Sequence, residues 1–144
     1  MLLNTLVLTL LLLPAPQTPQ ASADRTAITQ TALDYIEGFY DGSAERMTRA
    51  LHPDLAKRIV KVDAATGKAR LEHMGAETLI GFAKQREGKP TPKDKQQKDV
   101  TILDVYGNAA TVKVVANDWI DYLHVSKFDG RWVIVNVLWE MKQK

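Results

Sequence analysis

The amino-acid sequence predicts an α+β domain, with helices in its first half and an antiparallel sheet in its second. Apolar residues recur at intervals of three and four in the first half, which is typical of helices. From Val100 onward the chain is rich in β-branched and aromatic residues, and the dipeptides Gly107-Asn108 and Asp129-Gly130 are typical two-residue hairpin turns. Helices followed by a run of strands favour α+β over alternating α/β.

The size and composition of the chain exclude several classes of protein. Its 144 residues fit one domain, and its formal net charge of +2 excludes a protein that mainly neutralises phosphates, so we expect no nucleic-acid partner. The chain has no cysteine, which excludes disulfides, thiolate metal sites and a cysteine nucleophile. Its 3 histidines lack the spacing of metal ligands. We therefore expect neither a metal site nor a cofactor.

Residues 1–23 resemble a secretory signal peptide. The apolar run Leu2–Leu13 is too short to span a bilayer, which needs roughly 20 apolar residues. Three prolines and the small-residue tripeptide Ala21-Ser22-Ala23 follow it. We expect cleavage near Ala23, a mature domain over residues 24–144, a periplasmic or secreted location and no stable membrane span.

The helical part begins directly after this segment. An apolar stripe predicts a helix over residues 24–41, and Gly42 is a typical stop. Ser43 is a typical N-cap for a second, short helix, which should end before His52-Pro53. The stripe of the first helix consists of Ile28, Ala32, Tyr35, Ile36 and Phe39.

A hairpin is expected over residues 59–74, and a third short helix over residues 76–83. Residues 84–99 form a predicted loop with six basic residues. Such a loop could bind phosphate or an anionic surface, but a basic run without interleaved aromatic residues is more often a solvated connection. The four strands that complete the domain are expected at residues 100–106, 109–117, 118–128 and 131–141.

The hairpin at Asp129-Gly130 assigns the last two strands to faces, because it places Phe128 opposite Arg131 and side chains alternate from there. Both faces are largely apolar, although a half-solvated sheet should have one polar face. The first face carries Trp119, Asp121, Leu123, Val125, Trp132, Ile134, Asn136 and Leu138. The second carries Ile120, Tyr122, His124, Phe128, Val133, Val135, Val137 and Trp139.

Three short helices can cover only one of these faces. We expect a second copy of the chain to cover the other face, in a homodimer. A terminal segment or an irregular sheet edge is the alternative cover. The expected interface residues are Tyr122, Val135, Val137 and Trp139.

Two polar residues, Asp121 and Asn136, stand among apolar ones on the face assigned to the helices. A carboxylate in such surroundings is costly unless it is paired, and its pKa tends to rise. Asp121 is therefore a candidate general acid or base, or a hydrogen-bonding group for a ligand. The alternative is that Asp121 bonds helix backbone or points to solvent at the rim of the sheet.

Four segments of the sequence carry a resemblance to a known family. They are the stretches 35–42 (YIEGFYDG), 51–55 (LHPDL), 119–123 (WIDYL) and 128–136 (FDGRWVIVN). With these segments the sequence resembles the nuclear transport factor 2-like superfamily and, within it, the putative lumazine-binding-like branch. The resemblance implies a cone-shaped fold, in which N-terminal helices pack in a curved antiparallel sheet and leave a pocket at its open end. Superfamily members include enzymes, scaffold proteins and ligand-binding domains, so the fold alone does not fix the function.

The resulting functional expectation is an exported domain that binds a small hydrophobic or aromatic ligand between the first helix and the sheet. One alternative is an acid–base enzyme of the isomerase or dehydratase type, with Asp121 as catalytic base and Tyr35 or Tyr40 opposite it. Another is a protein-interaction module that uses the apolar sheet face. The expected ligand-binding residues are Tyr35, Tyr40, Trp119, Asp121 and Asn136.

Overall fold

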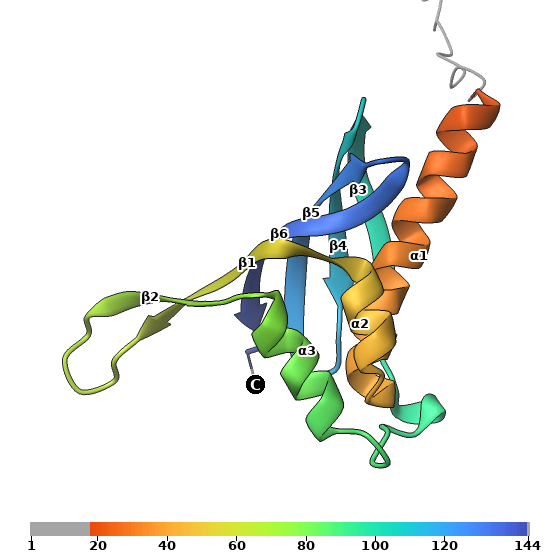
Figure 1. Ribbon diagram of the computed structural model, residues 1–144. Helices are drawn as coiled ribbons and strands as arrows, with labels where there is room; N and C mark the ends of the chain where they lie inside the picture. Colours follow the sequence, from red (N-terminus) through yellow and green to blue (C-terminus); the bar gives the residue numbers. More distant parts are fainter. Residues whose placement is uncertain (1–17, 144) are drawn as a thin grey trace, which may run out of the picture.

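A computed structural model describes residues 18–143, in which three helices pack against one face of a strongly curved sheet (Figure 1). The expected leader lies largely outside these residues, and residues 19–23 belong to the first helix. No helix within residues 18–143 is long and apolar enough to cross a membrane. The helices are α1 (Pro19–Asp41), α2 (Ala44–Ala50) and α3 (Ala76–Gln85), with a 3₁₀ turn, η1, at Lys93–Lys95. The strands are β1 (Leu51–Val62), β2 (Ala69–Met74), β3 (Asp99–Tyr106), β4 (Ala109–Val115), β5 (Trp119–Phe128) and β6 (Arg131–Met141).

The six strands form one sheet in the order β2-β1-β6-β5-β4-β3. All neighbouring pairs are antiparallel except β1 and β6, which run parallel. The sheet is thus antiparallel as expected except at this one pair, which is parallel because β1 is joined to β6 by a long crossover rather than by a hairpin. The order of helices and strands and the α+β class are as the sequence predicts.

The helix ends follow the sequence signals. Gly42 ends α1 with φ of 70°, and Ser43 caps α2 by accepting a hydrogen bond from the backbone N–H of Arg46. The His52-Pro53 pair does not lead into a loop. It lies in β1, which starts at Leu51 and is longer than the predicted strand.

The loop after α3 is fixed to the C-terminal end of α1. Lys93 pairs with Asp41 and Lys98 with Glu37, while the guanidinium of Arg86 donates to the carbonyl of Phe39. Part of the positive charge of this loop therefore holds the loop against α1.

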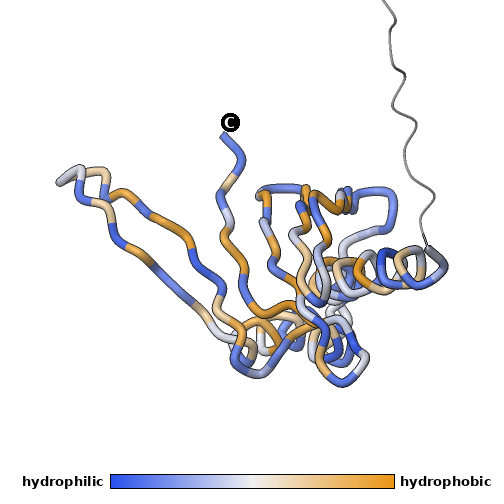
Figure 2. The backbone as a smooth tube through the Cα atoms, turned by 90° about the horizontal axis from the view of Figure 1, so that it is seen from above, coloured by the Kyte–Doolittle hydropathy of each residue, from blue (hydrophilic) through white to orange (hydrophobic). Residues whose placement is uncertain are grey.

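The hairpin of β1 and β2 extends away from the rest of the molecule (Figure 2). Residues 61–71 are all exposed, whereas Leu55 and Ile59, nearer the body, are buried. The core instead lies between the concave face of the sheet and the helices. Its largest fully buried side chains include Tyr40, Ile28, Ile36, Met47, Leu123 and Ile134.

A bulge in β6 changes which side chains face that core. The pairs nearest the turn, Phe128 with Arg131 through Val125 with Ile134, are as predicted, but the next pair is His124 with Asn136. One extra residue, Val135, is thus inserted into β6, and the alternation of faces reverses beyond it.

The reversal corrects the expected faces of four residues, Asn136, Val137, Leu138 and Trp139. Val137 and Trp139 lie on the concave face with Leu123 and Asp121, so they are not residues of the outer face. Asn136 is on the outer face and not in a pocket with Asp121. Tyr122 lies on the outer face as predicted, paired with the exposed Leu138.

Candidate functional site

A buried lysine, aspartate and tyrosine meet on the concave face of the sheet. The ammonium of Lys57 donates to Asp121 Oδ1 at 2.5 Å and to the phenol oxygen of Tyr35 at 2.6 Å. The phenol donates in turn to Asp121 Oδ2 at 3.1 Å. Tyr35 comes from α1, Lys57 from β1 and Asp121 from β5. The strands β1 and β5 lie on either side of β6, where Lys57 is opposite Val137 and Asp121 is opposite Trp139.

These three side chains are almost completely removed from water. Relative exposure is 4% for Lys57, 3% for Tyr35 and 0% for Asp121. Burial lowers the pKa of the Lys57 ammonium, an effect that the charge of Asp121 opposes. Burial, together with the Asp121 carboxylate, raises the pKa of Tyr35 well above its ordinary value. The hydrogen bonds of the trio therefore give each of these buried polar groups a partner in the interior.

Two tryptophans complete the surroundings of the trio. The indole N–H of Trp119 donates to Asp121 Oδ2 at 2.7 Å. The Lys57 nitrogen lies 4.8 Å from the ring centroid of Trp139, 5.3 Å from that of Tyr35 and 5.9 Å from that of Trp119. The ammonium thus has aromatic rings on several sides, a setting that favours a cation.

The two indoles differ in their hydrogen bonding. The N–H of Trp119 is used by Asp121, whereas the buried N–H of Trp139 has no hydrogen-bond partner among residues 18–143. A buried donor without a partner is uncommon and calls for an explanation.

The same two tryptophans line a cleft of about 620 Å³ where β5 begins and β6 ends. This volume is within the range of small-molecule sites. Four of the five other lining residues are polar, and both tryptophans also lie against the trio. The other lining residues are Asn117, Asp118, Met141, Lys142 and Gln143.

Of the residues expected to bind a ligand, Tyr35, Trp119 and Asp121 come together. Tyr40 is nearby but is engaged elsewhere, since its hydroxyl donates to the carbonyl of Gln97 at 2.8 Å and accepts from the backbone N–H of Asn117. It therefore positions the rim of the cleft. Asn136, on the far face of the sheet, accepts from the guanidinium of Arg58 at 2.8 Å.

Sequence reasoning missed Lys57 and placed Trp139 on the opposite face, as an interface residue. Lys57 lies in the alternation Leu55, Lys57, Ile59 of a half-buried strand. This pattern predicts that Lys57 is buried once the strand is taken to start at Leu51, before His52-Pro53. The position of Trp139 had no such signal, because nothing in the residues around Val135 distinguishes a bulge from a regular strand.

The geometry bears on the candidate base as well. Both oxygens of Asp121 accept hydrogen bonds, from Lys57, Tyr35 and Trp119, and the side chain has no exposed surface. A substrate could reach this carboxylate only after one of these donors had left. The arrangement is suited to holding Lys57 and Trp119 in place. Separately, the residues from 18 to 143 contain no cluster of three side chains that could ligate a metal.

Solved structures with this fold are numerous. An NTF2-like protein of unknown function from Shewanella baltica OS155 matches with a TM-score of 0.68 at 18% identity, over 90% of this chain and 100% of that one. Another from Silicibacter pomeroyi DSS-3 has a TM-score of 0.66 at 17% identity, over 84% and 98%. A third, from Methylobacillus flagellatus KT, has a TM-score of 0.64 at 24% identity, over 84% and 94%. At these identities the likeness establishes the fold alone.

Sequence comparison supplies the family. Comparison with curated proteins gives no match. The family described as "Putative lumazine-binding" matches residues 23–140, which include every residue of the trio and both cleft tryptophans. The chain therefore belongs to this family, and its fold is NTF2-like.

Proposed function

We propose that this domain binds a small, flat heteroaromatic molecule in the cleft between Trp119 and Trp139. The observation that carries the proposal is the cleft of about 620 Å³, whose aromatic walls have a buried ammonium behind them. Indole rings stack well on flat conjugated ligands. Lumazine, the compound in the family's name, is a ligand of this shape.

The hydrogen-bonding groups favour a neutral ligand that carries a carbonyl oxygen. Lys57 already has Asp121 as its counter-ion, so a further carboxylate would bring an unbalanced charge into the interior. The indole N–H of Trp139 lacks an acceptor within residues 18–143. A carbonyl oxygen would give this donor a partner without adding charge, provided that the Trp139 ring turns its buried N–H toward the cleft on binding.

Titration of the tryptophan fluorescence with lumazine tests the proposal. We expect saturable quenching in the native protein and at least about tenfold weaker binding in Trp139→Leu, because the stacking surface is lost. Met141→Leu, at the same cleft but without loss of a ring, should bind as the native protein does. Equal affinity in all three proteins would contradict the proposed site.

A second pair of ligands tests the carbonyl preference. Quinoxaline has the flat bicyclic shape without a carbonyl group, so we expect it to bind the native protein about tenfold more weakly than lumazine. Trp139→Phe keeps a ring and removes the N–H, and it should reduce this difference. Native mass spectrometry of protein purified from its producing host then identifies the physiological ligand.

We also propose that the protein is exported and cleaved after Ala23. Such a cut removes the first turn of α1 and leaves Asp24 at its start. The Asp24 carboxylate accepts from Lys127 at 2.8 Å and from the indole of Trp132 at 3.0 Å, so the new end would remain fixed to the sheet. N-terminal sequencing of the exported protein should begin at Asp24, and an uncleaved chain would contradict the proposal.

A further inference from the structure

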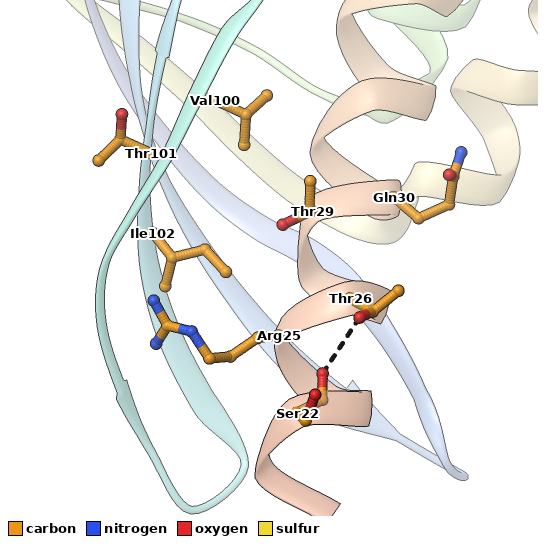
Figure 3. Close-up of a pocket in the computed structure, with 8 residues that line it drawn as sticks. All are labelled: Ser22, Arg25, Thr26, Thr29, Gln30, Val100, Thr101 and Ile102. Atoms are coloured by element: carbon orange, nitrogen blue, oxygen red, sulfur yellow. Dashed lines mark hydrogen bonds between the residues drawn. The ribbon is translucent and has the colours of Figure 1, made fainter. Parts of the chain in front are cut away.

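A second hollow, separate from the tryptophan cleft, lies between α1 and the edge strand β3. It has a volume of about 640 Å³ (Figure 3). Val100 and Ile102 point from β3 toward the helix, while Arg25 extends from the helix toward Ile102 and Thr29 faces the strand. The remaining lining residues are Thr26, Gln30 and Thr101, together with Ser22, which the proposed cleavage after Ala23 would remove. The hollow thus has an apolar strand side and a polar helix side.

The backbone of β3 is open along this hollow. β3 is the last strand of the sheet and pairs only with β4. Backbone groups of an antiparallel strand alternate in direction, so some along residues 100–102 point away from β4. No backbone hydrogen bond outside the sheet involves residues 99–106, and no side chain within residues 18–143 bonds to their backbone. Such an edge can accept another strand.

The usable part of the edge is short. The register of β3 with β4 shifts between Ile102 and Asp104, and a bulge of this kind prevents regular pairing beyond it. Residues 99–102 remain, which correspond to roughly 13 Å of extended chain at about 3.3 Å per residue. This length suits a peptide segment of about four paired residues.

Arg25 supplies the positive charge of the hollow, while Asp99, at the start of β3, lies at the end of the open edge. Arg25 is the one charged side chain among the eight that line the hollow, and it makes no ion pair or side-chain hydrogen bond to other residues of the 18–143 range. It also lines the adjoining hollow of about 390 Å³, toward Val105 and Gly107. A guanidinium in this position is complementary to a carboxylate.

We propose that the groove between α1 and β3 docks an extended, acidic peptide segment of another protein, which pairs with β3 as an additional strand. The main-chain hydrogen bonds run to residues 99–102 of β3. Apolar side chains of the peptide pack toward Val100 and Ile102, and an acidic side chain pairs with Arg25. This mode of binding combines backbone pairing for affinity with side-chain contacts for specificity.

A pair of charge-swapped peptides tests the proposal on the full chain. The probe is a fluorescein-labelled heptapeptide, Gly-Glu-Val-Thr-Val-Glu-Gly, and its counterpart has Lys in place of both Glu. By fluorescence polarisation, the native protein should bind the acidic peptide at least about tenfold more tightly than the basic one. Arg25→Glu should reverse this preference, whereas Arg70→Glu, a matched charge reversal on the exposed β2, should leave it unchanged.

Backbone pairing has its own test. Two versions of the acidic peptide carry N-methyl groups on alternate residues, one at the odd and one at the even positions. Only one of them blocks the N–H groups that face β3, so binding should be lost in that version and kept in the other. NMR shifts should map to amides of residues 99–102. Arg25→Glu should leave lumazine binding unchanged, which separates this inference from the proposed function.

Several results would overturn the inference. They are the absence of binding at millimolar peptide, an equal effect of Arg25→Glu and Arg70→Glu, and displacement of the peptide by free acetate at equal concentration. The last result would mean that the groove holds only a carboxylate. A change of oligomeric state in Arg25→Glu without peptide would mean that a second copy of the chain occupies the edge.

Discussion

At the scale of single residues, Lys57 and Asp121 form an ion pair that is buried in the core. Two ions are removed from water together, and each is costly to bury alone. Tyr35 and Trp119 add hydrogen bonds that satisfy the remaining capacity of the carboxylate. This degree of pairing is what allows a charged group to lie directly behind the aromatic walls of the cleft.

Replacing one member of the pair should be strongly destabilising. We expect Lys57→Met to lower the free energy of unfolding by about 3–5 kcal/mol, because Asp121 is left buried without a counter-ion. Lys61 lies on β1 like Lys57, but it is exposed and pairs with Glu72 of β2. Lys61→Met should therefore lower the free energy of unfolding by no more than about 0.5 kcal/mol. Urea denaturation measures both.

The double variant Lys57→Met/Asp121→Leu provides the control for this effect. It should recover much of the lost stability, since neither charge then remains in the interior. The sum of the stability losses in Lys57→Met and Asp121→Leu is the reference for the double variant. A loss in the double variant equal to that sum would show that the pair acts through packing and not through charge.

At the scale of elements, the α1–α2 junction is stabilised by ionised carboxylates. Burial tends to raise the pKa of Asp34, but hydrogen bonds from Arg49, Arg46 and Gln30 outweigh it and hold the pKa below the ordinary value of 3.8. A carboxyl group whose pKa is depressed on folding stabilises the protein above its unfolded pKa. That contribution is lost as the pH falls through the lower folded value.

Asp34→Asn should therefore make stability less sensitive to acid. We expect a loss of roughly 1–3 kcal/mol at pH 7, and a difference from the native protein that shrinks as the pH falls below 3.8. Urea midpoints from pH 2 to 7 measure the change. Glu77→Gln, on the exposed surface of α3, should follow the native curve, and parallel curves for all three proteins would contradict the assignment.

The turn between α1 and α2 makes a second prediction at this scale. A Cβ atom at Gly42 would lie 2.5 Å from the carbonyl carbon of Arg86, whereas one at Gly67 would meet nothing within 4 Å. The two glycines have nearly equal φ, 70° and 69°. Both alanine variants thus carry the same backbone cost, about 1–2 kcal/mol, and differ in the clash.

Gly42→Ala should consequently be about 1–3 kcal/mol less stable than Gly67→Ala, because the loop after α3 must move. Thermal unfolding of the two variants gives this difference directly. Equal melting temperatures would indicate that the loop yields without cost.

The elements also show which parts of the site the sequence could predict. Local signals such as Ser43 and Asp129-Gly130 placed helix caps and turns correctly, because each depends on a few adjacent residues. Membership of Asp121 in a buried face followed from simple alternation. The partner of Asp121 did not, since Lys57 reaches it across β6, and a parallel pairing between distant strands leaves no local pattern.

At the scale of the whole molecule, the outer face of the sheet is free of helices within the part of the chain described. Tyr122 and Leu138 are paired there, with exposures of 39% and 52%. We propose that a second copy covers this face. The bulge changes the expected interface, because Leu138 replaces Val137 and Trp139 beside Tyr122.

Leu138→Asp should convert a dimer into a monomer, since it places a charge at the centre of an apolar contact. Leu103→Asp, on the edge strand and equally exposed at 52%, should leave the dimer intact. Sedimentation velocity distinguishes the two states. A native protein that sediments as a monomer would contradict the proposed dimer.

The position of the trio also affects when the cleft can form. Lys57 and Asp121 are on strands that β6 separates in the sheet, and β6 is the last of the six strands within residues 18–143. During synthesis from the N-terminus, the ion pair cannot be enclosed until the final strand has been added between its two members. A chain shortened before Trp139 would have the charged residues but neither their cover nor the cleft. If the cleft binds lumazine as we propose, that binding reports that folding has been completed through β6, and fluorescence from the two cleft tryptophans can follow that step.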